Sequence, residues 1–275
     1  MKLTEAIQLT RKVRETWKEG AKGYWTTVYN SAHLVELLNN PEIDEIRPIH
    51  VVELQEKLSN LGKSPATINR VTQALRTILT CCVQMEELEK VPYFKQLKEA
   101  EGRQVIYTEQ EENALYQATK KLEKNSSLMF SALRFAFLTG CRQGELLKLT
   151  WKDVDWNLME LTFVSTKSGQ HRVLPLQGKL LELMLELYEE RIDDQVFSIG
   201  KDALIYWFRK VKQIAGMTEK EKVFHTIRHT VCSRLWLKGA DQPSIMSVMG
   251  HTQASTTQRY SHSTKNSIHS ALSLL

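Results

Sequence analysis

The chain has 275 residues, 42% of them hydrophobic, and a formal net charge of +5 at pH 7. Its length is sufficient for two domains with separate cores, and its mild charge means that any affinity for DNA must come from cations gathered on one face. There is no secretory signal or apolar run of membrane length, so a membrane-spanning or exported protein is excluded and a soluble one is expected.

Residues 1–104 predict a separate helical domain. Apolar residues recur at helical spacing in four segments, of which the last is the clearest because it opens with an N-cap serine followed by proline at the first helical position. The four predicted helices span Thr4–Trp17, Trp25–Leu38, Ile49–Leu58 and Ser64 to about Leu88.

The last of these helices carries a polar face beside its apolar one. Asn69, Gln73 and Arg76 follow one another at a spacing of four and three residues, which places them on one side of a helix. Amide and guanidinium groups can read base edges in the major groove. For three polar residues an ordinary solvated face is the simpler explanation, and DNA binding by these three is the alternative.

A polar, charged stretch at Lys98–Val105 predicts a linker, and Thr108 with Glu111 forms a capping box that begins the next helix. The domains are therefore predicted at 1–104 and 105–275. A strongly apolar helix at Ser126–Leu138 should be buried and should end at Gly140. Arg142 then precedes a short predicted helix at Gln143–Thr150.

The segments that follow predict a β-hairpin. Leu161–Ser165 and Arg172–Leu176 are rich in strand-forming residues, and Gly169 between them permits the positive φ of a tight turn. Lys167 is therefore expected at or beside the hairpin tip.

Five further helices are predicted at Leu180–Tyr188, Lys201–Ile214, Thr226–Leu237, Asp241–Val248 and Ser255–Tyr260. His225 and Arg228 would share the first turn of the third of these, and the fourth would point His251 into the same pocket. A final apolar stripe, Ile268, Leu272 and Leu275, is too short to fold alone and should dock on a groove of a catalytic domain.

These side chains suit an attack on a phosphodiester. Planar guanidinium groups match the non-bridging oxygens, so Arg142 and Arg228 are the expected clamp, and Glu145 lies close enough to brace Arg142. Tyr260 is a candidate nucleophile, because the positive site favours its phenolate and His225 or His251 could take its proton. Lys167 could protonate the departing oxygen.

Each feature alone has an ordinary explanation: a surface pair, a solvated lysine, a loop histidine or a core tyrosine. Their combination in one order is what favours catalysis. No carboxylate cluster of the kind that binds two metal ions accompanies them, so neither a metal nor another cofactor is expected.

In these residues the chain resembles the tyrosine recombinase, or phage integrase, family. Thr139–Glu145 matches the family's T-G-x-R-x-x-E box, and His225–His229 matches its H-x-x-R-H box, which adds His229 to the site as a supporting residue. Met249-Gly250-His251 corresponds to L-G-H before the nucleophilic tyrosine, here Tyr260, and Lys167 follows a strand as the family's active-site lysine does. The resemblance covers roughly residues 108–262.

The resemblance implies an α+β, mainly α fold, with an N-terminal helical core-binding domain and a mostly helical catalytic domain that holds a small antiparallel β-sheet. In the family's core-binding domain the corresponding helix approaches DNA, so the resemblance implies that Asn69, Gln73 and Arg76 bind it. It implies a site-specific recombinase, an integrase or excisionase of a phage or mobile element, that works through a 3′-phosphotyrosyl intermediate. Its partners would be double-stranded DNA with inverted core-type sites, three further protomers in a homotetramer on two duplexes, and accessory DNA-bending or directionality factors. It would act in the cytoplasm, at the nucleoid or in a host cell, and the tail would dock on a neighbouring protomer or in cis.

Three alternatives stay open. A chromosome-dimer or plasmid resolution recombinase would share every catalytic residue, and a type IB topoisomerase uses related chemistry. A DNA-binding regulator could use the same basic cleft without cutting, and a covalent protein–DNA adduct would exclude it.

Overall fold

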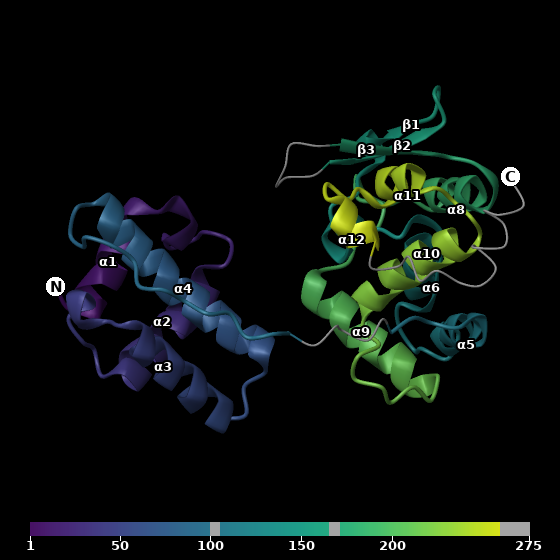
Figure 1. The fold of residues 1–275 in the computed structure, drawn as a ribbon. Helices are drawn as coiled ribbons and strands as arrows, with labels where there is room; N and C mark the ends of the chain where they lie inside the picture. The colour runs from purple at the N-terminus through teal and green to yellow at the C-terminus, as the bar shows by residue number, and fades with distance from the viewer. Residues whose placement is uncertain (100–104, 165–170, 259–275) are drawn as a thin grey trace, which may run out of the picture. The chain divides into compact units, whose positions relative to one another are not determined.

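The computed structural model describes residues 1–99, 105–164 and 171–258. The chain divides into two compact units, Met1–Gly102 and Arg103–Leu275. Both are built mainly of helices, and the second also contains a small antiparallel sheet (Figure 1). The predicted fold class is therefore confirmed.

The first unit consists of α1 (Leu3–Val13), α2 (Tyr24–Leu38), α3 (Pro48–Asn60) and α4 (Pro65–Gln84). Helix α4 contacts the other three and supplies much of the core. It begins as predicted, because the Ser64 hydroxyl accepts a hydrogen bond from the Thr67 amide and Pro65 occupies the first turn. It ends before the predicted Leu88, since Glu86 has the left-handed φ of 62° that an α-helix does not continue through.

The second unit is organised around α6 (Ser126–Thr139), whose side chains include several with no exposed surface. This helix contacts α5 (Glu109–Thr119), α8 (Gly178–Glu189), α9 (Lys201–Ile214) and α10 (Phe224–Leu237). The predicted capping box at the start of α5 is present, with the Thr108 and Glu111 side chains each bonded to the other's backbone amide. A rigid apolar helix therefore lies directly before the Arg142 segment.

The sheet has the order β1 (Val154–Asp155), β2 (Glu160–Val164), β3 (His171–Pro175), with both pairs antiparallel. Val164 pairs with His171, so the predicted hairpin is confirmed. Burial alternates along β3, and its two inward-facing residues are Arg172 and Leu174. Helix α11 (Gln242–Met249) contacts β3, and the two lie side by side in Figure 1.

Helix α7 (Gln143–Leu146) is shorter than the predicted Gln143–Thr150. The backbone beyond it pairs with a distant segment, because the Val196 amide donates to the Leu149 carbonyl at 3.0 Å and the Trp151 amide to Asp194 at 2.9 Å. Tertiary pairing here replaces the last turns of helix that local sequence favours. The described chain ends with α12 (Ala254–Gln258), so the tail residues Ile268, Leu272 and Leu275 lie outside it.

Candidate active site

The tight turn from α6 into α7 places Arg142. Gly140 ends α6 with a φ of 60°, and a Cβ atom on it would lie 3.0 Å from the Met249 side chain. Glycine thus satisfies both the left-handed backbone and the close approach of α11. Arg142 follows as the N-cap residue of α7 and keeps 43% of its side chain exposed.

Two anchors hold the Arg142 guanidinium in place. Its Nη1 donates to Glu145 Oε1 at 2.7 Å, and its Nη2 donates to the Gly250 carbonyl at 2.8 Å. The Arg142 amide also donates to Glu145 Oε2 at 2.8 Å. The brace expected from the spacing of three residues is therefore present, and part of the guanidinium remains open to a ligand.

Arg228, in the first turns of α10, is only 4% exposed. Its Nη1 donates to the Gly140 carbonyl at 2.9 Å and its Nη2 to the Met249 carbonyl. Burial, followed by the neighbouring Arg142 and Arg172, lowers the pKa of Arg228 to about 10, so it is still a cation at neutral pH. Carbonyl dipoles fix this group, but they do not cancel its charge.

Three histidines complete the described part of the predicted set. The rings of His225 and His229 meet edge to face, 5.0 Å apart between centroids. Partial desolvation and the nearby His229, Arg228 and Arg142 lower the pKa of His225 to about 4, although much of the residue's surface is open to solvent. His225 is therefore neutral at pH 7.

His251 follows the left-handed Gly250, whose φ is 62°. A hydrogen bond of 2.9 Å joins its Nδ1 to the Thr257 hydroxyl of α12. Desolvation, then Arg228, Arg142 and Arg172, lower the pKa of His251 to about 4. It too is neutral at pH 7 and lies among the same cations as His225.

Arg172 belongs to this cluster, although sequence reasoning treated it only as the start of a strand. Its Nη2 donates to Glu145 Oε2 at 2.7 Å, and its guanidinium stacks on the Phe163 ring at 4.1 Å. Burial alone would raise the pKa of the Glu145 carboxyl, but Arg172 and the hydrogen bonds from Arg142 lower it below the usual value. A single carboxylate thus joins two guanidinium groups. The only available signal was an arginine at an inward-facing strand position.

Two predicted site residues, Lys167 and Tyr260, lie outside the described residues. What the structure brings together is Arg142, Arg172, Arg228, Glu145 and the three histidines. Three guanidinium groups around one carboxylate leave an excess of positive charge, which suits an anion with several oxygens, such as a phosphodiester.

In the first unit, the predicted DNA-reading residues Asn69 and Arg76 make internal contacts. Asn69 is 7% exposed, and its amide group bonds to both the carbonyl and the amide of Leu97 at 2.9 Å. Arg76 Nη2 donates to the Phe94 carbonyl at 3.1 Å. The α4 face that was predicted to be free is thus partly covered by residues 94–99, and Gln73 is its exposed member.

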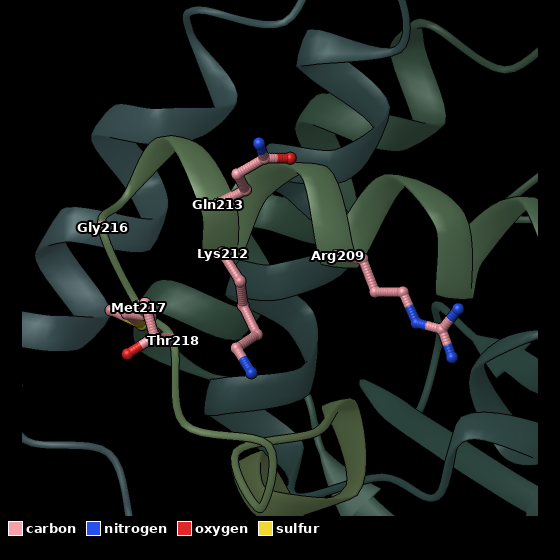
Figure 2. A pocket seen from close by; sticks show the side chains of 6 residues that line it. All are labelled: Arg209, Lys212, Gln213, Gly216, Met217 and Thr218. Carbon is pink, nitrogen blue, oxygen red and sulfur yellow. The ribbon is translucent and has the colours of Figure 1, made fainter.

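Helix α9 presents a second polar face. Tyr206, Arg209, Lys210 and Gln213 are exposed, while Leu204, Phe208 and Val211 are buried. Arg209 and Lys212 extend from the same side of α9 beside a pocket of about 190 Å³ (Figure 2). Lys212 Nζ donates to the Glu219 carbonyl at 2.7 Å, so Arg209 is the better placed of the two for an external anion.

No group of three or more His, Cys, Asp or Glu residues that could hold a metal ion occurs within residues 1–99, 105–164 and 171–258. In the same ranges, no helix combines the length and the apolar character that crossing a bilayer requires.

Residues 106–267 match the family model described as "Phage integrase family". A "Tyrosine recombinase XerA" from Thermococcus onnurineus is 27% identical over 227 residues, which cover 78% of this chain and 77% of that protein.

Two solved structures share the fold at low sequence identity. The Tn1549 transposon integrase in complex with circular intermediate DNA aligns with a TM-score of 0.78 and 19% identity over 99% of each chain. A lambda integrase tetramer bound to a Holliday junction aligns with a TM-score of 0.77 and 16% identity, covering 96% of this chain and 80% of the other.

Proposed function

Because this chain belongs to the phage integrase family and is a site-specific DNA recombinase of the tyrosine type, we propose that its second unit cuts and rejoins DNA through a covalent bond to Tyr260. The observation that carries the proposal is the convergence of Arg142 and Arg228 with two histidines that are neutral at pH 7. The test is whether the protein forms a denaturant-resistant adduct with a nicked DNA substrate that traps the cleaved state.

In the proposed reaction, the Tyr260 oxygen attacks the scissile phosphorus as the bond to the 5′ oxygen breaks. Neutral His225 accepts the phenol proton, and Lys167 donates a proton to the departing 5′ oxygen. Arg142 and Arg228 stabilise the charge that spreads over the non-bridging oxygens. The 5′ hydroxyl of a partner strand then attacks the 3′-phosphotyrosyl bond and restores a phosphodiester, so no external energy source is required.

Glu145, His229 and His251 support this reaction in the proposal. Glu145 holds Arg142, and His229 packs against the His225 ring. His251, hydrogen-bonded to Thr257 in α12, connects the arginine cluster to the segment that precedes Tyr260 and is a second candidate for the proton acceptor.

The pH dependence of cleavage follows from the lowered pKa of His225. A base must be neutral to accept a proton, and a pKa near 4 keeps His225 neutral far below the pH of about 6.5 at which an ordinary histidine becomes protonated. With DNA below saturation, we expect the cleavage rate to stay constant from pH 8 downward and to fall only as the pH approaches about 4. Single-turnover rates across this range provide the measurement, with DNA binding measured at each pH.

Replacing Arg142 by Gln should raise the pH of half-maximal rate, because the Arg142 charge contributes to the lowered pKa of His225. Arg134→Gln, which removes a cation paired with Glu186 elsewhere in the unit, is the matched control and should leave it unchanged. A wild-type midpoint close to 6.5 would contradict the role of His225 as a base with a lowered pKa.

We propose that residues 1–104 bind core-site DNA and that residues 105–275 form the catalytic domain. Gln73 on α4 and the exposed α9 face, Tyr206, Arg209, Lys210 and Gln213, are the proposed DNA contacts. The α9 residues suit this role because a guanidinium and an amine bind phosphates, while an amide can also reach base edges.

The two surfaces should differ in what they recognise. Arg209→Ala should weaken binding to all sequences alike and reduce the salt dependence by about one phosphate contact, because it removes one cation. Gln73→Ala should change the preference among core-site variants by roughly 1–3 kcal/mol for a lost base contact. Competition binding against a library of sites at several salt concentrations measures both effects.

Asn69→Ala should instead lower the melting temperature of the protein, because the three described hydrogen bonds of Asn69 are all internal.

For the biological role, we propose an integrase or excisionase of a phage or mobile element that acts in the cytoplasm. Support comes from the shared fold over 99% of both chains with a transposon integrase. The relative described as tyrosine recombinase XerA favours the second candidate, a chromosome-dimer or plasmid resolution recombinase. For a mobile element, direct repeats should flank the integrated DNA, and amplification across the gene's boundaries should also yield the junction of an excised circle. A resolution enzyme should give neither result.

The proposed partner is double-stranded DNA with inverted core-type sites, on which four protomers assemble across two duplexes. The lambda integrase tetramer on a Holliday junction supports this assembly, because it has the same fold. Light scattering tests the assembly by measuring the mass of the complex that the protein forms with one and with two site-bearing duplexes. Accessory bending factors would be indicated if recombination required host extract.

A further inference from the structure

Arg172 lies at the centre of the arginine cluster, with only 7% of its side chain exposed. Its aliphatic part approaches the α11–α12 turn so closely that a Cβ atom on Gly250 would lie 2.8 Å from Arg172 Cδ. Its guanidinium reaches two other segments, with Nη2 bonded to Glu145 in α7 and Nη1 to the Val248 carbonyl in α11. Arg172, on β3, therefore contacts both of the segments that bind Arg142: α7, which carries Glu145, and the end of α11, which precedes Gly250.

Arg172 bonds directly to one of the two anchors of Arg142 and to a carbonyl near the other. The first anchor is Glu145, whose Oε1 binds Arg142 while its Oε2 binds Arg172. The second anchor is the Gly250 carbonyl, which lies two residues after the Val248 carbonyl that Arg172 binds. Loss of Arg172 would leave a nearly buried carboxylate with one cation in place of two and would free the turn that carries Gly250.

We infer that Arg172 is a positioning residue for the recombination reaction, which acts by fixing Glu145 and the Gly250 turn so that Arg142 meets the scissile phosphate. The inference rests on the proposed function of the site. Arg172 itself is too buried to reach DNA, whereas Arg142 keeps 43% of its side chain exposed. Its contribution to the rate is therefore transmitted through Arg142.

A merely structural role predicts a different result. A buried ion pair can often be replaced by apolar groups without loss of stability, and methionine could preserve the packing on Phe163. Arg172→Met thus separates charge and hydrogen bonding from volume. Arg172→Lys keeps a cation but cannot hold Glu145 and Val248 together, because an ammonium lacks the guanidinium fork.

The test measures single-turnover cleavage on two substrates, a normal phosphodiester and a neutral methylphosphonate at the scissile position. We expect Arg172→Met to slow cleavage of the phosphodiester by about 10- to 100-fold, the scale for misplacing a reacting group by about 1 Å. With the methylphosphonate, the cleavage rate of Arg172→Met should be only a few-fold below that of wild type, because less negative charge needs to be stabilised in the transition state. Arg172→Lys should be intermediate on the phosphodiester, and DNA affinity should stay within about two-fold for both variants.

The matched control is Arg134→Met, because Arg134 also bonds one glutamate, Glu186 at 3.0 Å, and lies over a phenylalanine ring. It should cleave both substrates at the wild-type rate. Added to Arg142→Ala, the Arg172→Met change should cost almost nothing further, because the residue acts through Arg142.

Wild-type cleavage by Arg172→Met, an equal loss on both substrates, or full additivity with Arg142→Ala would each overturn the inference while adduct formation by the wild type upholds the proposed function. If Arg172→Met does not fold, as judged by its melting curve, Arg172→Lys carries the same comparison.

Discussion

The Tyr260→Phe variant is expected to form no covalent adduct with DNA and to show no strand exchange, while it binds its site with nearly wild-type affinity. The substitution removes only the phenolic oxygen that becomes bonded to phosphorus, and phenylalanine fills nearly the same volume. Affinity should survive because it depends mainly on cations and polar groups that contact phosphates. On a nicked substrate whose cleaved strand dissociates, wild-type protein should accumulate as a denaturant-resistant species and the variant should not.

A matched control for this experiment is Tyr29→Phe, which removes the hydroxyl of an exposed tyrosine on α2. It should form adduct at the wild-type rate even if DNA affinity changes slightly. Adduct formation that persists in Tyr260→Phe would assign the nucleophile to another residue. Mapping of the DNA-linked peptide by mass spectrometry would then identify it.

The second large effect is expected for the arginine clamp. Arg142→Ala should reduce the single-turnover cleavage rate by at least about 100-fold, the scale for losing one preorganised donor at a site where charge develops. Arg142 gives the cleaner variant, because it is half-exposed and its loss leaves no buried cation without a partner. Binding to uncleaved DNA should change far less than the rate.

Arg228→Ala should lower the rate to a similar degree, but it also removes the donor to the buried carbonyls of Gly140 and Met249. Its melting temperature must therefore be measured beside its rate. A methylphosphonate at the scissile position should partly restore both arginine variants, whereas sulfur in place of the 5′ leaving oxygen should restore only Lys167→Ala, since a thiolate departs without a proton. Loss of less than ten-fold in folded Arg142→Ala would contradict its role in the clamp.

Local sequence signals predicted most elements of this fold. Caps and apolar periodicity located α4, α5, α6 and α9, since N-cap side chains and buried faces depend on residues within a few positions of one another. The same signals placed Arg142 after a buried helix and His225 with Arg228 in the first two turns of α10. The identity and order of the candidate residues were therefore available before the structure.

Distant segments decided two features that local sequence could not show. The face of Asn69 and Arg76 looked free because nothing in the helix itself covers it, yet residues 94–99 return along α4 and bond to both side chains. Helix α7 was predicted too long because its last turns are locally favourable, whereas pairing with residues 194–196 decides their conformation.

By itself, the sequence determined the fold class and predicted the candidate residues of the site, because these depend on residue types and local periodicity. Only the tertiary structure decided that Glu145 is shared by Arg142 and Arg172, and that partial desolvation beside Arg142 and Arg228 lowers the pKa of His225 and of His251 to about 4. Hydrogen bonds between β3, α7 and α11, and desolvation within the cluster, arise from segments far apart in the chain. No short-range pattern records such contacts, so the role of Arg172 became visible only when the chain was folded.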